Sequence, residues 1–318
     1  MPQIARLTKV WRAPESTKGT KVAVTKCISA TSVSFRPIAV KGNDEGSLWT
    51  IDILSQQDLT QTRLEVAVEG ILKPNNTSDL FRACLGTVNT TWSDPYVHTL
   101  TLKNDNDHPA YTIYHEDVVG KEAWVYCMLS ELTLSAQVEN HVTYNSSWLG
   151  QQLVASTDTP TYDNEESFIA RQVTIEIADD IAWLDSPTTI NARSLNLTFN
   201  KNVLEDFKLW KLEPFNLYNQ WFAVSGDIEL TMTNRSFRDL TLNNTKKAMR
   251  ITITWDEVID ETPDVFNTIV ITMWSVAFED WDHSTSNDDI VTNTVWFIKE
   301  KGEPTNIQVV LTNTRAVV

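Results

Sequence analysis

The 318-residue sequence contains only 9 glycines, 11 prolines and 3 cysteines, and each shortage excludes a class of protein. The low glycine and proline content, beside 42% hydrophobic residues, excludes a collagen-like or disordered chain. No apolar run approaches the roughly 20 residues that a membrane-spanning helix needs. Cys27, Cys84 and Cys127 are odd in number and lack metal or redox spacing, which predicts buried free thiols in a reducing compartment.

Positive charge is also scarce, because 26 Lys and Arg residues stand against 42 Asp and Glu residues, for a formal net charge of −16. Proteins that hold nucleic acid present a surplus of Lys and Arg to the phosphates. Nucleic acid is therefore either no partner of this chain or a molecule that must pass without adhering. The first 24 residues carry several basic side chains but no continuous apolar segment, so we expect no signal peptide.

Motifs of common catalytic and cofactor sites are missing from the sequence. It has no H-E-x-x-H, G-x-S-x-G, G-x-G-x-x-G or Walker pattern, and its five histidines are scattered. The acidic runs at residues 104–107 and 279–283 are better explained as solvated turns than as metal loops, and the first lacks the glycine and distal glutamate of a calcium loop. We therefore expect no enzyme activity, no metal site and no cofactor.

Alternation of apolar and polar residues is the main feature that the sequence does contain. Val173, Ile175 and Ile177 alternate with polar neighbours, which is typical of a strand with one buried face. The pattern predicts an all-β protein made of β-sandwich domains. The same period recurs at residues 64–68, 195–199, 228–232, 251–255 and 307–311.

One helix is predicted between these strands. Ser78 suits an N-cap, Asp79 suits the first turn, and Gly86 suits the position just past the C-terminus. The apolar residues between them fall on one helix face, so we expect the helix to flank a sheet.

The chain repeats a pattern at about half its length. Residues 28–35 read I-x-A-x-S-V-x-F, and residues 190–197, which lie 162 positions later, read I-x-A-x-S-L-x-L. The segment at 76–81 is echoed at 234–237. Internal repetition marks a duplicated structural unit. We therefore predict two β-sandwich domains related by duplication, at residues 1–165 and 166–318, although chance likeness between two strands is the alternative.

Each copy is predicted to carry a long loop between the repeated strand and a repeated glycine, Gly70 or Gly226. The loops span about 36–62 and about 200–220, and loops of this length are usually functional. Apolar residues on a protruding loop mark a surface to be covered, unless the loop folds back onto its own sandwich. The candidate contact residues are Trp49, Ile51, Ile53, Trp210, Phe215 and Tyr218.

Four segments follow one another in the stretch from about 79 to 155: the capped helix, an aromatic strand, a P-x-[FY]-T-I-like strand and a strand reading V-Y-C-M-L-S-E-L-T-L-S-A. In this order the stretch resembles the double-domain tail tube proteins of long-tailed bacteriophages. Tyr126 departs from the family pattern, which has glycine before Cys127, and the first 60 residues match little. The segments are 80–86, 96–102, 109–116 and 125–136, with 194–199 and 224–230 fitting the second half.

The resemblance implies a virion structural protein that assembles with itself. A duplicated subunit would form trimeric, pseudo-hexameric rings that stack into a hollow tail through which phage DNA is ejected. Tape measure, tail terminator and distal tail proteins would be partners, with assembly in the host cytoplasm and no membrane insertion. Acidic residues would then line the bore and repel phosphate, and Glu65, Glu176 and Glu229 are the candidates on predicted strands.

Two other readings stay open at the level of sequence. One is another β-rich virion part, such as a distal tail or capsid decoration protein. The other is a secreted glycan-binding pair of sandwiches, which the 12 tryptophans and several N-x-[ST] sequons favour and the unpaired cysteines oppose.

Overall fold

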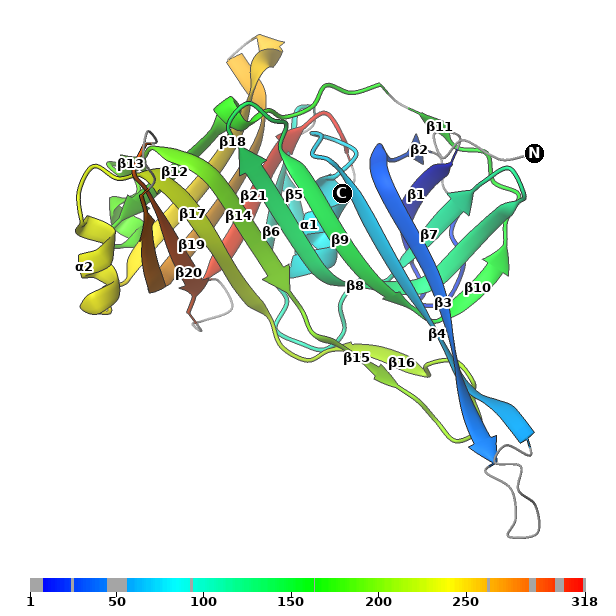
Figure 1. Cartoon of the computed structure of the whole chain (residues 1–318). Helices are drawn as coiled ribbons and strands as arrows, with labels where there is room; N and C mark the ends of the chain where they lie inside the picture. Colours follow the sequence, from blue (N-terminus) through cyan, green and yellow to red (C-terminus); the bar gives the residue numbers. More distant parts are fainter. Residues whose placement is uncertain are drawn as a thin grey trace.

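The computed structural model describes residues 8–23, 26–44, 56–91, 94–162, 164–261, 264–285, 290–300 and 306–316. These residues form an extended antiparallel β-structure with two flanking α-helices, α1 (Ser78–Leu85) and α2 (Ser236–Leu242) (Figure 1). The predicted all-β fold with a flanking helix is confirmed. Helix α1 lies near the middle of the molecule, and α2 lies at one end.

The strands of the first half are β1 (Lys9–Pro14), β2 (Lys26–Cys27), β3 (Ala30–Asp44), β4 (Gln56–Ile71), β5 (Gly86–Thr91), β6 (Tyr96–Leu102), β7 (Tyr111–Glu116), β8 (Lys121–Gln137), β9 (Thr143–Gly150) and β10 (Gln152–Ala155), followed by β11 (Thr161–Tyr162). The second half contains β12 (Val173–Ala178), β13 (Thr188–Ile190), β14 (Ala192–Asn200), β15 (Val203–Asp206), β16 (Asn216–Asn219), β17 (Ala223–Thr231), β18 (Lys247–Glu261), β19 (Asp264–Ser284), β20 (Thr292–Lys299) and β21 (Ile307–Asn313). Short 3-10 turns occupy Ala170–Gln172 and Ile181–Trp183.

Eight strands form one continuous antiparallel surface, which we call the long sheet. Its order is β3-β4-β9-β8-β14-β17-β20-β19. Side chains alternate between its two faces, so one face buries Val68, Leu132 and Ile228 in the core while the other stays polar. Both halves of the chain contribute to this sheet, because β8 pairs with β14 across the midpoint.

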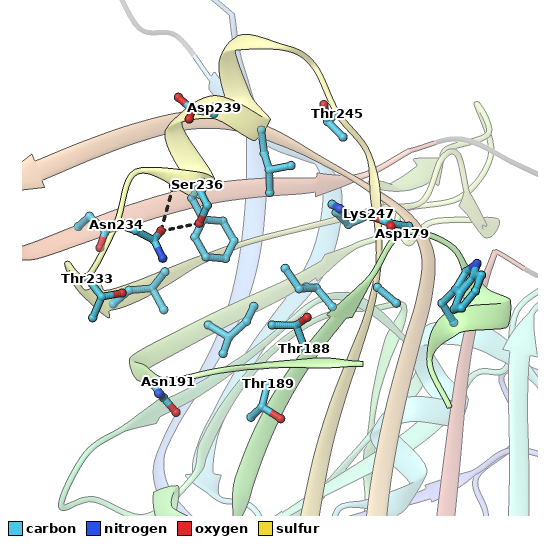
Figure 2. A pocket seen from close by; sticks show the side chains of 18 of the residues that line it. Asp179, Thr188, Thr189, Asn191, Thr233, Asn234, Ser236, Asp239, Thr245 and Lys247 are labelled. Carbon is cyan, nitrogen blue, oxygen red and sulfur yellow. Dashed lines mark hydrogen bonds and ion pairs between the residues drawn. The ribbon is translucent and has the colours of Figure 1, made fainter. Parts of the chain in front are cut away.

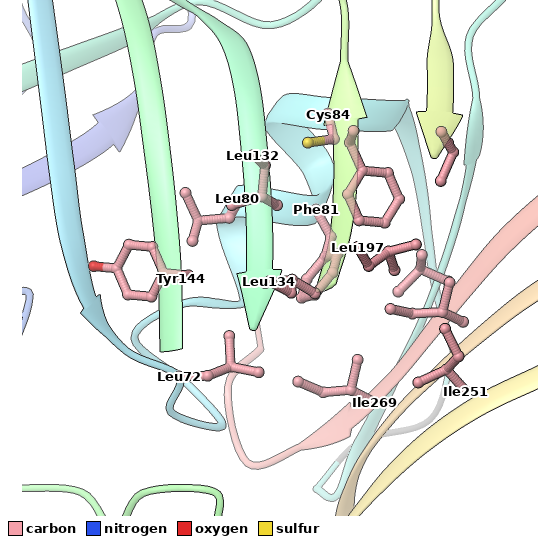
Figure 3. Packing of buried hydrophobic residues seen from close by; sticks show 14 of the residues in the cluster. Leu72, Leu80, Phe81, Cys84, Leu132, Leu134, Tyr144, Leu197, Ile251 and Ile269 are labelled. Atoms are coloured by element: carbon pink, nitrogen blue, oxygen red, sulfur yellow. The ribbon is translucent and has the colours of Figure 1, made fainter. Parts of the chain in front are cut away.

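Helix α1 packs its residues against the buried face of the long sheet. Leu80, Phe81 and Cys84 are fully buried beside Leu132 and Leu197 (Figure 3). The ring of Phe81 meets the edge of Phe199 from the second half, at a centroid distance of 6.4 Å. The helix therefore closes the core at the point where the two halves join.

The start of α1 differs from the prediction by one residue, whereas Gly86 lies just past its C-terminus as predicted. Thr77 is the N-cap and Ser78 is the first helical residue, because the Ser78 hydroxyl donates instead to the carbonyl of Asn75 at 2.8 Å. Gly86 follows the helix with φ of 91°, a conformation that glycine adopts without strain.

The repeat found in the sequence is present in strand register. Val33 pairs with Val68 in the hairpin β3–β4, and Leu195 pairs with Ile228 in the hairpin β14–β17. Both hairpins contain a bulge at the same place, one residue past Ala30 in β3 and one past Ala192 in β14. Bulges are defined irregularities that a chance likeness between two strands does not reproduce.

A second pair of bulges extends the correspondence. The pairing β8–β9 slips between Leu129 and Glu131, and β19–β20 slips between Phe278 and Asp280. Strands β8 and β19 are therefore equivalent, as are β9 and β20. In the remaining elements, β1 pairs with β7 as β12 pairs with β18, and β10 pairs with β8 as β21 pairs with β19.

The proposed equivalence of Gly70 and Gly226 is wrong. The register places Gly70 opposite Tyr144 on β9, and Gly226 opposite Phe297 on β20, at different heights of the two hairpins. A Cβ at Gly70 would lie 2.8 Å from the Tyr144 ring, and one at Gly226 would lie 2.6 Å from the Phe297 ring. A backbone carbonyl lies closer still, that of Ser29 at 2.5 Å from the Gly70 Cβ position and that of Asn196 at 2.3 Å from the Gly226 position, so neither site has space for a side chain.

The range 36–62 is not simply a loop. Its described residues continue β3 and β4 as a paired ribbon, which projects from the body of the molecule (Figure 1). Likewise the range 200–220 contains the hairpin β15–β16, whose strands pair from Val203–Asn219 to Asp206–Asn216. Alternation is weak at the outer end of the β3–β4 ribbon because neither of its faces is buried there. In β16 every second residue is buried, but the strand has only four residues, so the pattern is short.

Candidate functional site: the polar face, edges and tips of the long sheet

The polar face of the long sheet is strongly acidic. Its cross-strand neighbours include Asn196 beside Asp227, Ser194 beside Glu229, and Asp227 beside Trp296. Basic residues on this face are Arg36 and Arg63, which both lie 3.5 Å from Glu65. The acidic residues that alternation places on this face are Glu65, Glu69, Glu131, Asp227, Glu229, Asp280 and Asp282.

Amide side chains hold several of these carboxylates in place. The Nδ2 atom of Asn196 donates to Asp227 at 3.0 Å, and that of Asn200 donates to Glu131 at 3.1 Å. Neutral donors of this kind fix the orientation of a carboxylate without cancelling its charge. Glu65 is paired with Arg36 and Arg63, whereas Asp227 and Glu131 are oriented by neutral amides and keep their negative charge.

The three predicted acidic candidates are not together. Glu65 and Glu229 lie on the polar face, on β4 and β17. Glu176 lies on β12, outside the long sheet, and accepts a hydrogen bond from Arg250 at 2.7 Å. Alternation alone could not separate them, because the pattern identifies two faces of a strand but not the sheet to which the strand belongs.

Sequence reasoning missed Asp227, Asp280 and Asp282 as members of this face. Asp227 lies two residues before Glu229 and so shares its face, a signal that was available from the alternation. Asp280 and Asp282 follow the bulge in β19, which shifts the alternation by one residue. Their face could not be read without knowing where the bulge falls.

Both edges of the long sheet lack a strand partner within the described residues. Strand β3 pairs with β4 along one edge. Strand β19 pairs with β18 up to Val276, and beyond it β20 pairs along one side only, from Val276 to Ser284. Unpaired edges are ready to receive another strand.

The hairpin β15–β16 has a buried base and an exposed tip. Leu217 packs with Tyr126 and Met128 of the first half, and Thr62 donates its backbone N–H to the carbonyl of Leu212 at 2.8 Å. The base of the hairpin thus folds back onto the chain, which is the alternative to a contact loop that the sequence left open. The tip does not, because Trp210 keeps 72% of its surface exposed.

The predicted contact residues fall on different parts of this hairpin. The ring of Phe215 meets Trp210 edge-on at 6.1 Å, and the ammonium of Lys211 lies over both rings. Tyr218 is half-buried on β16 and accepts a hydrogen bond from Asn216 at 2.8 Å. Trp49, Ile51 and Ile53 lie outside the described residues.

A buried lysine lies at the junction between the halves. Lys201 follows β14, is fully buried, and donates from Nζ to the carbonyl of Ala83 in the last turn of α1 at 2.7 Å. Burial lowers the pKa of Lys201 to about 7, since removal from water disfavours the charged form. The neighbouring Cys84 thiol is fully buried too, and burial raises its pKa to about 12, so it stays protonated.

A cavity of about 890 Å³ lies beneath α2, between β12, β13 and the end of β17 (Figure 2). Polar residues such as Thr188 and Asn191 line it beside Phe237 and Leu240. The carboxamide of Asn234 accepts hydrogen bonds from the backbone and hydroxyl of Ser236 at the start of the helix. Nearly all residues of α1 are buried, whereas no residue of α2 is buried. The end of the molecule that carries α2 is therefore accessible to solvent.

Within the described part of the chain, no cluster of three His, Cys, Asp or Glu side chains could hold a metal ion. No helix there is long and apolar enough to cross a membrane. A family model described as "Phage tail tube protein" matches residues 6–295. Comparison with curated proteins finds no match.

Proposed function

Since this chain belongs to the phage tail tube protein family, we propose that it forms stacked rings that make the hollow tail of a virion. Through this tail the phage DNA would be ejected, with a structural rather than a catalytic role for the protein. The observation that carries the proposal is the long sheet, which has one acidic face. Within the described residues, its edge strand β3 and the part of β19 beyond Val276 are each paired along one side only. A curved sheet of this kind, joined edge to edge around an axis, encloses a bore.

The duplicated strand register supports a trimeric ring. We take residues 1–165 and 166–318 as the two copies, which meet at the β8–β14 pairing. Three chains would then place six equivalent units around the axis. A head-to-tail contact of this kind closes into a ring, whereas stacking of rings extends the tube. Tape measure, tail terminator and distal tail proteins are the proposed partners at its interior and ends.

We assign the acidic polar face to the bore. Duplex DNA carries about one charge per 1.7 Å of its axis, so a wall of ordered carboxylates offers no site at which phosphate is held. Screening limits this repulsion to about 8 Å at physiological salt, which is enough only where a narrow bore confines the DNA close to the wall. The wall would therefore let DNA slide.

Charge reversal on this face tests the assignment. Glu65→Lys combined with Glu229→Lys should leave tubes intact in electron micrographs and slow DNA ejection from the assembled virion. Glu166→Lys, at an exposed position outside the long sheet, is the matched control and should eject normally. Intact tubes with wild-type ejection in the double variant would contradict the acidic bore.

The tips of the hairpin β15–β16 are proposed to contact the neighbouring ring. The exposed pair Trp210 and Phe215, covered on one side by Lys211, is an apolar surface that water does not favour. Negative-stain electron microscopy of the purified chain, before and after concentration, tests the assembly itself. Hollow tubes support the proposal, whereas discrete monomers at every concentration count against it and favour a screen for bound glycans.

A further inference from the structure

The pairing between β8 and β14 is a contact between two copies of the repeat inside one chain. Residues 131–137 of β8 lie antiparallel to residues 194–200 of β14. On the polar face the hydroxyls of Thr133 and Thr198 are 3.0 Å apart, and on the core face Leu132 lies opposite Phe199. The β8–β14 pairing therefore shows, residue by residue, how one copy of the repeat joins the next.

Within the described residues, the same two strand edges occur once more without a partner. The bulges make β19 the equivalent of β8, with Asp280 matching Glu131. The sequence repeat makes β3 the equivalent of β14, with Val33 matching Leu195. Strand β19, the equivalent of β8, therefore has an open edge at one end of the long sheet. Strand β3, the equivalent of β14, has an open edge at the other end.

We propose that β19 of one copy pairs antiparallel with β3 of the next copy, in the register of β8 and β14. The proposal rests on the ring-forming function and names the contact that closes the ring. On the polar face, Asp282 then lies opposite Arg36 of the next copy, and Ser284 lies opposite its Ser34. On the core face, Trp281 lies opposite Pro37 of the next copy.

The chemistry of the two edges agrees with this register. The side chain of Arg36 lies 3.5 Å from Glu65 of its own chain but is still 71% exposed, and Asp282 is exposed too. In the proposed register the two side chains therefore present opposite charges to one another. Directly opposed charges on neighbouring strands attract, and like charges there repel. In the inner junction the same position holds two threonines, so only the junction between separate chains carries a charge pair.

Apolar groups at the two edges also match. Trp281 stacks on His283 with ring centroids 5.6 Å apart, at the border of the core. Phe35 is half-buried at the opposite edge, 4.4 Å from the ring of His115. In the proposed register Phe35 of the next copy faces His283, so these rings would cover one another. Pro37 has no N–H, and the ladder lacks one hydrogen bond there.

Disulfide trapping tests the register directly. Residues directly opposite on antiparallel strands have Cα atoms about 4.5 to 5.5 Å apart, within reach of a disulfide. Ser34→Cys with Ser284→Cys should give reducible covalent oligomers from assembled tubes. Ser34→Cys with Thr285→Cys is the matched control, because a shift of one residue turns the second thiol to the other face of the sheet.

Charge exchange provides an independent test. Arg36→Asp or Asp282→Arg alone should raise the protein concentration needed for tubes by about tenfold, because each places like charges opposite one another. The combination of both should restore assembly toward the wild-type level. Thermal unfolding of each variant checks that the fold is intact.

The outcomes separate this proposal from the function on which it rests. Tubes that assemble without the Ser34–Ser284 cross-link, or that cross-link equally in the shifted control, overturn the register and leave the tube function standing. Single charge variants that assemble like the wild type also overturn it. Wild-type protein that never assembles contradicts the tube function, and the junction with it.

Discussion

Replacing Lys201 with methionine should remove a pH dependence from the stability of the folded chain. The Lys201 ammonium is enclosed where β14 of the second half passes α1 of the first, and its described hydrogen bond goes to the Ala83 carbonyl. Burial lowers the pKa of Lys201 from 10.5 to about 7. In the unfolded chain the lysine keeps its ordinary pKa, so between about pH 7 and 10 unfolding takes up a proton.

The sign and size of the effect follow from this uptake. Because the unfolded state binds more protons, the free energy of unfolding rises with pH through this window. The destabilisation caused by burying Lys201 disappears completely only above the pKa of the lysine in the unfolded chain. One proton corresponds to about 1.4 kcal/mol per pH unit. Since the folded lysine is half-titrated near pH 7, we expect the wild type to gain about 2 kcal/mol more than Lys201→Met between pH 7 and 9.

Urea unfolding at pH 7, 8 and 9 measures this difference, at a protein concentration below that of tube formation. Lys41→Met removes an exposed lysine from β3 and is the control, which should follow the wild-type slope. Parallel pH profiles for the wild type and Lys201→Met would refute the reasoning, because they would mean that Lys201 keeps its charge in the folded chain. The absolute stability at pH 7 is a weaker readout, since methionine also leaves a carbonyl without its donor.

Three further predictions concern packing, charge burial and assembly. Gly226→Ala places a Cβ 2.6 Å from the Phe297 ring and should cost about 2 kcal/mol in thermal unfolding, whereas Gly120→Ala, with open space around it, should leave the melting temperature unchanged. Asp79→Asn breaks the buried ion pair in which Arg12 donates two hydrogen bonds of 2.7 Å to the Asp79 carboxylate, and it should lower the free energy of unfolding in urea by about 3 to 5 kcal/mol. A loss below about 1 kcal/mol would mean that Arg12 finds another partner. Trp210→Ser should keep the melting temperature but prevent tubes in electron micrographs, and a large drop in melting temperature would instead place the ring in the core.

The buried charge pair itself was not predicted from the sequence. Burial alone would lower the pKa of Arg12, but the charge and hydrogen bonds of Asp79 more than offset it and raise that pKa. Asp79 was expected only as a favourable residue in the first turn of a helix. Its partner is 67 positions away, and nothing in a local pattern links residues at that separation.

The sequence was informative wherever burial imposed a period. Alternation located the strands with one buried face, and the glycine and the apolar residues of α1 located the flanking helix. The repeat at 28–35 and 190–197 was also in correct register. Each of these features depends on residues that contact the core within a few positions of one another.

Sequence reasoning failed where no single core sets the pattern. The projecting residues of β3 and β4 have no buried face, so a paired ribbon was taken for a loop. Bulges in β8 and β19 shift the faces by one residue, which concealed Asp280 and Asp282. Glu176 was grouped with Glu65 because alternation carries no information about which sheet a strand joins.

The pairing of β8 with β14 has a consequence for how the protein responds to dilution. Both strands belong to one chain, so this contact forms at an effective concentration set by the tether and not by the amount of protein present. Any contact between separate chains weakens as protein becomes scarce, but this one does not. The smallest unit that dilution can release is therefore a chain whose two halves are already joined, and every encounter during growth adds a pair of repeats rather than one.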